Sequence, residues 1–192
     1  MNSEEILSIF KQTEALLEGH FKLTSGLHSA QYFQCAKVLQ YPEYLQLLCG
    51  FIADFYKDKK IEVVISPALG GIAVGQEVGR QMNARSIFAE RQDGVLQLRR
   101  GFEIKSGENV LICEDVVTTG GSTRDVIDIV KSNGGRVIGT ASIVDRSNGK
   151  VMFNVPNQFS VLKMDVVSFQ PEVCPLCKQN IPVLKPGSRG NK

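Results

Sequence analysis

The stretch from Val110 to Thr123, VLICEDVVTTGGST, joins an apolar run to two adjacent carboxylates and then to a loop of hydroxyls and glycines. The short apolar run is typical of a buried strand, and the segment that follows Ser122 is typical of a helix closed by glycines. In an open α/β sheet, ligands bind beyond the carboxyl ends of the strands. We therefore expect the residues from Glu114 to Ser122 to line a binding site.

The two halves of this stretch suit the two ends of a sugar phosphate. Glycines let successive N–H groups of the backbone converge on a phosphate, and a helix N-terminus adds its positive dipole end. The carboxylates of Glu114 and Asp115 can accept hydrogen bonds from vicinal hydroxyls or hold Mg²⁺. Two alternatives remain: the acidic strand of a P-loop nucleotidase, although the chain has no G-x-x-x-x-G-K-[ST] motif, or a simple turn with helix-capping acids.

The remaining segments alternate between helical and extended patterns. Asn2 and Glu5 have the spacing of a capping box, and Gly19 can end the helix that they begin. Helices are predicted at residues 2–18, from Pro42 through Phe55, at about 72–82 and at 122–135, with Tyr44, Leu48, Phe51 and Phe55 facing the core. Strands are predicted at residues 61–67, 85–90, 109–115 and 136–145. This alternation predicts a mostly parallel sheet with right-handed crossovers.

Composition narrows the class of protein. The chain has 192 residues, which suits one domain, and its formal net charge of +2 without a long basic run gives no reason to expect nucleic acid or membrane binding. The tetrad KDKK at 57–60 is interpreted as a solvated turn. The acidic, amphipathic N-terminus is unlike a signal peptide, so we expect a cytoplasmic protein.

Cysteine spacing leaves one metal question open. Five cysteines without a secretion signal favour reduced thiols. Cys174 and Cys177, in CPLC, have metal-ligand spacing, but zinc needs about four ligands and no His or Cys follows them. A structural turn is therefore favoured over a metal site, unless a dimer pools two such pairs.

The motifs resemble a known family. VLICEDVVTTGGST resembles the phosphoribosyl pyrophosphate signature of type I phosphoribosyltransferases. The blocks GHFKLTSGLHSAQYFQCAKVLQYPE, ISPALGGIAVG, FAERQDGVLQLRRGFEI and SIVDRSNG resemble, in this order, segments of the orotate phosphoribosyltransferases. The similarity to their Thermus-type subgroup runs nearly end to end and includes the tail CPLCKQNIPVLKPGSRG.

The resemblance implies a fold and a reaction. The fold would be the α/β type I phosphoribosyltransferase fold, a mostly parallel central sheet flanked by helices. Residues 1–192 would form a single domain, with a hood from about 20–40 and 165–192 and a core of about 41–164. The enzyme would convert orotate and phosphoribosyl pyrophosphate to orotidine monophosphate and pyrophosphate in pyrimidine biosynthesis, as a homodimer that uses Mg²⁺.

The resemblance also implies a binding site for phosphoribosyl pyrophosphate. Glu114 and Asp115 would bind the ribose hydroxyls, and Mg²⁺ would be carried mainly by the substrate, with a contact at Asp115 left open. The loop that meets pyrophosphate lacks the lysine of some relatives, so its backbone N–H groups would carry more of the binding. The implied binding residues are Ala68, Leu69, Gly70, Gly71, Arg91, Glu114, Asp115, Val116, Val117, Thr118, Thr119, Gly120, Gly121 and Ser122.

Orotate would be held by a second group of residues: Lys22, Ser25, Gly26, Phe33, Thr118 and Arg146. The planar guanidinium of Arg146 suits the carboxylate of orotate. A surface ion pair with Asp145 is the alternative for Arg146, and a solvated side chain is the alternative for Lys22. Phe33 is as well explained by core packing as by stacking on the substrate.

Residues 90–101, ERQDGVLQLRRG, correspond to a mobile lid in related enzymes. Many orotate enzymes carry a lysine- and histidine-rich lid, whereas this segment has neither residue type. Arg91, Arg99 and Arg100 could supply the positive charge, and we count Arg91 and Arg99 with Glu114 and Asp115 as candidate catalytic residues. Ordinary edge-strand charges on a hairpin are the alternative.

Two other functions fit the same signature. One is a phosphoribosyltransferase for a purine base. The other is a non-catalytic regulator that senses phosphoribosyl pyrophosphate. Turnover of orotate separates both from the favoured function.

Overall fold

The computed structural model of the protein describes residues 1–23 and 25–186. Thr24, within the FKLTSG segment, and the last part of the conspicuous tail, residues 187–190, lie outside the described residues. The chain divides into two compact units, one formed by Met1–Val38 together with the chain from Asp165 onward, and the other by Leu39–Met164. Each unit is described by itself, and the single domain with a hood stays a prediction.

The larger unit contains a six-stranded sheet with the order β5-β4-β3-β6-β7-β8. All neighbours are parallel except β4 and β5, which form an antiparallel hairpin at one edge. The strands are β3 (Val63–Pro67), β4 (Arg85–Gln92), β5 (Val95–Leu98), β6 (Asn109–Val117), β7 (Arg136–Asp145) and β8 (Gln158–Lys163). The predicted mostly parallel α/β sheet is therefore confirmed.

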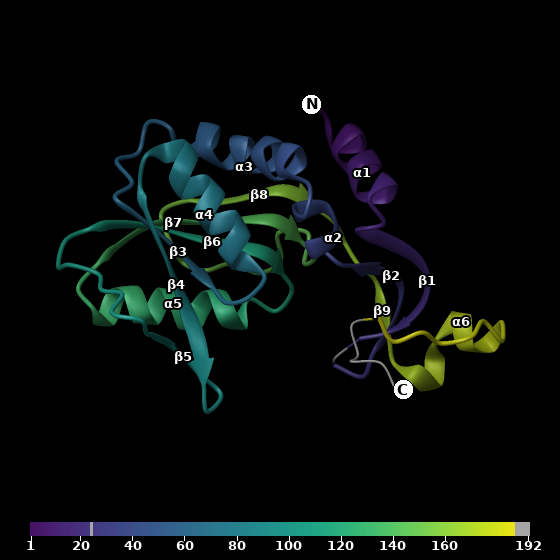
Figure 1. Ribbon diagram of the computed structural model, residues 1–192. Coiled ribbons are helices and arrows are strands. Elements are labelled where there is room, and N and C mark those ends of the chain that lie inside the picture. The colour runs from purple at the N-terminus through teal and green to yellow at the C-terminus, as the bar shows by residue number, and fades with distance from the viewer. Residues whose placement is uncertain (24, 187–192) are drawn as a thin grey trace. The chain divides into compact units, whose positions relative to one another are not determined.

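Helices cover both faces of this sheet. Figure 1 shows α3 (Pro42–Tyr56) and α4 (Gly71–Met82) on one face and α5 (Gly121–Ser132) on the other. The side chains of β3 alternate between the two layers, so that Ile65 belongs to the cluster packed under α5 while Val64 lies toward α4. Every residue of β3 is buried, as expected for a central strand of a parallel sheet.

The buried face of α3 differs from the predicted one. Pro42 begins the helix as expected. However, the buried residues are Leu48, Cys49, Ile52 and Tyr56, and Phe55 is 47% exposed. Aromatic spacing was misleading because Tyr56, one position further on, enters the core and donates a hydrogen bond from its hydroxyl to the backbone oxygen of Thr140 (2.8 Å).

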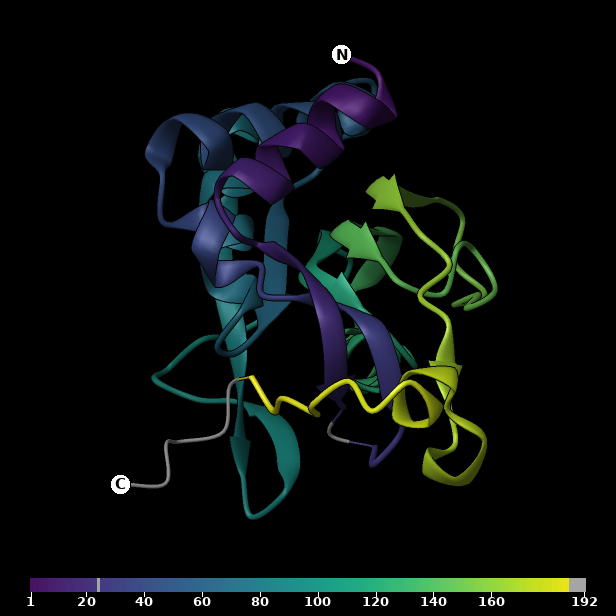
Figure 2. The ribbon, with the colours of Figure 1, turned by 90° about the vertical axis from the view of Figure 1, so that its right-hand side faces the viewer.

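The smaller unit is built on a three-stranded antiparallel sheet. Its order is β1-β2-β9, formed by β1 (Leu16–Lys22), β2 (His28–Phe33) and the two-residue β9 (Ser168–Phe169). Short helices follow in the chain: α2 (Ala36–Leu39) after β2, and η1 (Pro171–Val173) and α6 (Pro175–Lys178) after β9. Figure 2 shows the yellow C-terminal segment beside the ends of β1 and β2, where the backbones of Lys22 and Leu184 are hydrogen-bonded.

The first helix is shorter than predicted. The capping box of Asn2 and Glu5 is confirmed, but α1 (Ser3–Gln12) ends before Thr13. Glu14 then has a positive φ of 53°, which no helix continues through, and the chain enters β1. The prediction of a helix to residue 18 ended by Gly19 is wrong, because Leu16 and its neighbours pair with β2.

Among the described residues, none of the helices is long and apolar enough to cross a bilayer.

Candidate functional site

The carboxyl ends of β3 and β6 meet at the centre of the sheet. The chain leaves β3 through α4 to reach β4 on one side, and β6 later pairs with β3 on the other side. This reversal of strand order is a topological switch point, where open α/β sheets bind their ligands. The ALGG turn follows β3, and the acidic pair lies in the last residues of β6.

A hollow of about 280 Å³ opens beside the end of β6. It is lined by Glu114, Val116 and Val117 of β6, by the turn Thr118–Gly120, by the start of α5 and by Arg91 of β4. The structure thus brings together most of the residues that the sequence predicted to hold the ribose phosphate. Thr123 and Asp125, which also line the hollow, were not predicted, because an additional hydroxyl and acid in the first turns of a helix carry no distinctive sequence signal.

The turn before α5 has the backbone that a phosphate cradle needs. Gly120 has φ of 75°, a conformation that favours glycine, and a Cβ there would clash with Phe153 and Val151. Arg124 donates a hydrogen bond to the backbone oxygen of Thr119 (2.6 Å) and its guanidinium lies over the Phe153 ring. Phe153, Val151 and Arg124 therefore support the turn, while the residues at the start of α5, whose N–H groups are free of intrahelical partners, line the hollow.

The two carboxylates differ in environment. Glu114 is buried, with 8% of its surface exposed, and accepts a hydrogen bond from the backbone N–H of Asp115 (3.2 Å). Burial raises the pKa of Glu114 to about 9, and the side chain of Asp115 adds to the effect through a hydrogen bond and its charge. Glu114 is therefore protonated near neutral pH, so that its carboxyl can both donate and accept a hydrogen bond.

The ALGG turn lies against this acidic pair. A Cβ at Gly70 would clash with the carboxylate of Asp115, and a Cβ at Gly71 would come within 3.3 Å of Glu114 Oε1. A side chain at Gly70 would require the Asp115 carboxylate to move, so the backbone of the predicted pyrophosphate loop adjoins Asp115. The Ala68–Leu69 peptide is cis, and the Leu69 side chain is 83% exposed.

Arg146 follows the end of β7, the next strand. Its backbone N–H donates a hydrogen bond to the backbone oxygen of Val117 (2.9 Å), so it lies beside the end of β6. The carboxylate of buried Asp145 accepts hydrogen bonds from the backbone and hydroxyl of Ser147 and from the backbone of Gly149. These contacts fold the turn after β7 and keep Arg146 at the carboxyl edge of the sheet.

The predicted lid is the β4–β5 hairpin with its following turn. Arg91 pairs with Asp125 on α5 (3.3 Å) and lies at the rim of the hollow. Arg100 pairs with Glu90 in the same hairpin (2.7 Å), and Arg99 is exposed. Arg100 therefore has the contacts of an ordinary edge-strand charge on a hairpin, which was the alternative to a role in the lid. Arg91, in contrast, is within reach of a ligand in the hollow.

Four of the predicted orotate-binding residues belong to the smaller unit. Lys22 and Ser25 are exposed and half-buried Gly26 has a positive φ of 86° in the turn between β1 and β2. Phe33 is 5% exposed and packs edge-on against Phe10, with ring centroids 6.0 Å apart. Its contacts are those of a core residue, the alternative already considered for it.

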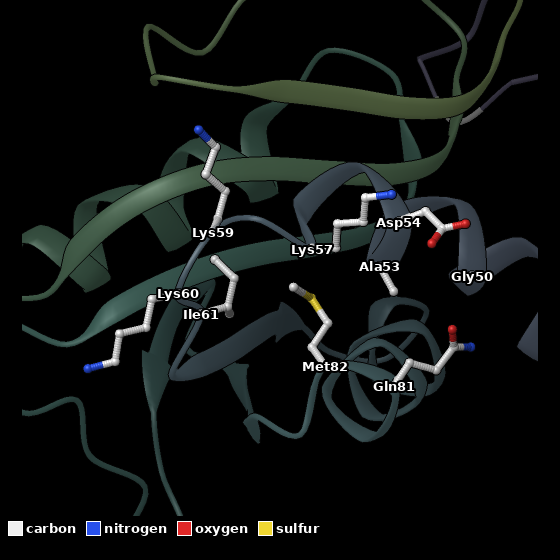
Figure 3. Close-up of a pocket in the computed structure, with 9 residues that line it drawn as sticks. All are labelled: Gly50, Ala53, Asp54, Lys57, Lys59, Lys60, Ile61, Gln81 and Met82. Atoms are coloured by element: carbon white, nitrogen blue, oxygen red, sulfur yellow. The ribbon is translucent and has the colours of Figure 1, made fainter.

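A larger hollow at the opposite edge of the sheet does not provide a comparable site. It has a volume of about 600 Å³ and is lined by residues at the ends of α3 and α4 and before β3. Figure 3 shows Lys57, Lys59 and Lys60 extending from this segment with their ammonium groups pointing away from one another. Because it lies at the amino ends of the strands and its charges do not converge, we assign it no ligand.

Comparisons with known proteins agree with this geometry. The model of the phosphoribosyl transferase domain family matches residues 35–169, more than half of the chain, so the fold and the hollow at its switch point are those of a phosphoribosyltransferase. An orotate phosphoribosyltransferase of Chlorobaculum parvum is 59% identical over 191 residues, covering 100% of this chain and 98% of that protein. The chain therefore belongs to the orotate phosphoribosyltransferases.

Solved structures share the fold at low sequence identity. The crystal structure of orotate phosphoribosyltransferase from Aeropyrum pernix has a TM-score of 0.71 and 22% identity, covering 82% of this chain and 93% of that one. Adenine phosphoribosyltransferase from Rhodothermus marinus has a TM-score of 0.66 and 19% identity, covering 83% of this chain and 99% of that one. The shared fold therefore does not determine whether the base is orotate or a purine. The predicted type I fold and family are confirmed, and the Thermus-type subgroup stays a prediction.

Proposed function

We propose that this protein transfers the ribose 5-phosphate group from phosphoribosyl pyrophosphate to orotate, giving orotidine monophosphate and pyrophosphate in pyrimidine biosynthesis. Family membership supports this reaction. The observation that carries it is the hollow at the switch point, which is lined by the phosphate cradle and by Glu114, while the neighbouring Asp115 lies against Gly70 of the ALGG turn. A sugar phosphate has hydroxyls that suit the carboxylates at residues 114–115 and a phosphate that suits the cradle at residues 118–122.

The cradle would hold the 5′-phosphate. Backbone N–H groups at the start of α5, the hydroxyls of Thr118, Thr119 and Ser122, and the helix dipole all favour an anion there. Thr118 is the cradle residue nearest the end of β6, so it is also suited to face the base. Fixing the phosphate fixes the position of the anomeric carbon, which is the main task in a reaction that needs little proton transfer.

The acidic pair would bind the ribose hydroxyls. The protonated Glu114 can donate to one hydroxyl oxygen and accept from another hydroxyl, while Asp115 accepts. Departure of pyrophosphate leaves positive charge on the ribosyl centre, and a carboxylate close to it stabilises that charge. Burial of Glu114 makes the geometry of the pair rigid.

The pyrophosphate would leave across the loop Ala68–Gly71. Its backbone adjoins Asp115, and it carries no cationic side chain, so backbone N–H groups have to meet the leaving group. The oxygen donors of Asp115 and the substrate fit Mg²⁺, which supplies charge neutralisation on the pyrophosphate when it is bound. Arg91, at the rim of the hollow, is the candidate for a further charge on the phosphates, and Arg99 is the exposed alternative on the hairpin.

Orotate would lie between the ribose site and the turn after β7. The backbone of Arg146 lies beside the end of β6, and its fork-shaped guanidinium suits the carboxylate of orotate. Lys22, Ser25 and Gly26, at the end of β1 and in the turn that follows it, stay the further residues for which the family resemblance implies contact with the base. Phe33 is a weaker candidate, because it is packed in the core of that unit.

We further propose a cytoplasmic homodimer without nucleic acid or membrane partners. The family resemblance supports the dimer, and a net charge of +2 without a long basic run gives no reason to expect nucleic acid binding. Sedimentation or gel filtration with light scattering tests the dimer directly.

The test of the reaction is the ultraviolet absorbance of orotate after mixing with phosphoribosyl pyrophosphate and Mg²⁺. Adenine, hypoxanthine, xanthine and uracil are assayed in parallel. We expect magnesium-dependent loss of orotate alone. Turnover of a purine instead would make this a purine-type enzyme, and binding of phosphoribosyl pyrophosphate without turnover of any base would make it a sensor.

A further inference from the structure

Four metal-binding side chains converge in the smaller unit, outside the site described above. His20 lies in β1, His28 begins β2, Cys174 precedes α6 and Cys177 lies within it. One ligand atom from each lies within 4.8 Å of all the others. The sequence indicated only the CPLC pair as a possible metal site. Its partners, His20 and His28, precede it by more than 140 residues, and such a separation gives no spacing signal.

Four of the six distances among these ligand atoms are close to those between the ligands of a tetrahedral zinc ion. His20 Nε2 lies 3.5 Å from Cys174 Sγ and 3.8 Å from Cys177 Sγ, and His28 Nδ1 lies 3.3 Å from Cys177 Sγ. Zinc bonds of about 2.3 Å to sulfur and about 2.0–2.1 Å to nitrogen place tetrahedral neighbours about 3.5 Å apart. The two imidazole nitrogens, now 2.9 Å apart, need to separate by only about 0.4 Å to reach the same geometry.

The second nitrogen of His20 is arranged as in a metal ligand. His20 Nδ1 lies 2.7 Å from the backbone oxygen of Ile181, to which an N–H at that position donates. This hydrogen bond leaves Nε2 with its lone pair toward the cysteines and His28. Ligating histidines in metal sites almost always have such a partner on the other ring nitrogen.

The segment that carries the cysteines has few other contacts to hold it. Between Pro171 and Pro186, Cys174 is the one fully buried residue among those the structure describes. Val173 and Leu184 are 61% and 57% exposed, and β9 pairs through only two residues. A short segment with so little apolar burial commonly depends on a metal or a disulfide for its order.

We propose that His20, His28, Cys174 and Cys177 bind one structural zinc ion. Thiolate and imidazole ligands suit zinc and not the oxygen-seeking Mg²⁺ of the catalytic site. All four ligands come from the chain, and three of them are buried, which leaves no position for substrate. The ion ties β1 and β2 to the C-terminal segment.

The zinc would also fix the turn between its two histidines. His20 and His28 flank the segment that contains Lys22, Ser25 and Gly26. This consequence rests on the proposed function, in which that segment contacts orotate. Loss of zinc is then expected to raise KM for orotate more than KM for phosphoribosyl pyrophosphate, whereas zinc binding itself can be measured whether or not the protein turns over orotate.

Metal analysis of the purified wild-type protein is the primary test. The protein is produced with zinc present, kept reduced, passed over a desalting column with a weak chelator and measured by mass spectrometry of the elements. We expect about one zinc per chain. Wild-type protein that carries less than roughly a tenth of an equivalent, and takes up none when refolded with zinc, overturns the proposal.

Variants separate these ligands from other thiols. Cys174→Ser and Cys177→Ser are each expected to lose zinc, while Cys49→Ser, a buried thiol of the larger unit, keeps it. Because a ligand variant can fail to fold, cobalt(II) added to metal-free wild type provides a second readout. The expected spectrum has thiolate-to-cobalt charge transfer and the visible bands of tetrahedral cobalt. Retention of zinc by both serine variants, an octahedral cobalt spectrum, or a Cys174–Cys177 disulfide in the freshly isolated protein each contradicts the site.

Discussion

The two units of the chain are stabilised by different means. The larger unit buries whole strands between helices, and its active groups lie on turns at the ends of those strands. The smaller unit has a three-stranded sheet whose last strand has two residues, and its C-terminal segment is mostly exposed. The comparison teaches that the sugar phosphate site is supported by apolar packing between sheet and helices. The C-terminal segment of the smaller unit has little such packing and carries two of the four proposed zinc ligands.

The strongest test of the larger unit is Asp115→Asn. The isosteric amide keeps the shape beside Gly70 but removes the charge near the ribosyl centre. We expect turnover to fall by about two to three orders of magnitude while the melting temperature is unchanged. Steady-state assays with thermal melts measure both. Asp128→Asn, an exposed acid on α5, is the matched control, and wild-type turnover in Asp115→Asn would contradict the role given to the acidic pair.

The second prediction contrasts packing in the two units. Ile65→Ala removes a fully buried side chain from the core of the larger unit and is expected to lower the free energy of unfolding by about 2–5 kcal/mol. Val183→Ala, at a position 44% exposed in the smaller unit, is expected to change it by less than about 0.5 kcal/mol. Denaturant titrations give both values. Equal losses in the free energy of unfolding would show that the exposed C-terminal segment contributes as much apolar burial as the central strand.

Arg146→Ala tests recognition of the base. Loss of a charge-assisted hydrogen bond to the orotate carboxylate is expected to lower kcat/KM for orotate by about 10- to 100-fold. The binding of phosphoribosyl pyrophosphate, measured by calorimetry, should stay within about twofold, because its phosphate is held elsewhere. Lys163→Ala, an exposed cation at the carboxyl end of the adjacent strand β8, serves as control. Unchanged orotate kinetics would remove Arg146 from the site.

The last prediction concerns a pH dependence of stability. The pKa of Glu114 is about 9 in the folded protein against 4.5 ordinarily, so between these values the folded state holds a proton that the unfolded chain has released. Stability from this group is present at low pH and is lost as pH rises toward 9. We therefore expect Glu114→Gln to melt several degrees above wild type at pH 9 and close to it at pH 5. A difference in melting temperature between the two proteins that does not change with pH would contradict the raised pKa and indicate that Glu114 is more hydrated.

The sequence was a good guide to the larger unit for a physical reason. Continuous β-branched runs such as 61–67 can only be buried strands in an alternating pattern, and Gly120 and Gly121 indicate both a left-handed turn and a helix start. The acidic pair and the cradle could therefore be placed at one sheet edge without coordinates. The position of Asp125 could not be predicted, because its ion pair with Arg91 joins α5 to β4 and is a tertiary contact.

The smaller unit was predicted less well. An amphipathic pattern ran past Gln12, and nothing local indicated that Leu16 would pair with Phe33 instead of continuing the helix. The proposed zinc ligands were only half visible for a related reason. The spacing of Cys174 and Cys177 was noted, but His20 and His28 lie in hairpin strands far from them in the sequence. Where local patterns compete with long-range pairing, the tertiary contacts decide the structure.

The glycine at position 120 has a consequence for how this enzyme could change its base. Phe153 and Val151, which occupy the space that a side chain at Gly120 would need, belong to the same loop that begins at Arg146. Any remodelling of this loop to accept a different base also moves the support of the phosphate turn. New specificity reached through residues 146–153 is thus expected to carry a penalty in affinity for the sugar phosphate, so that directed evolution toward other bases would need paired substitutions on both sides of Gly120.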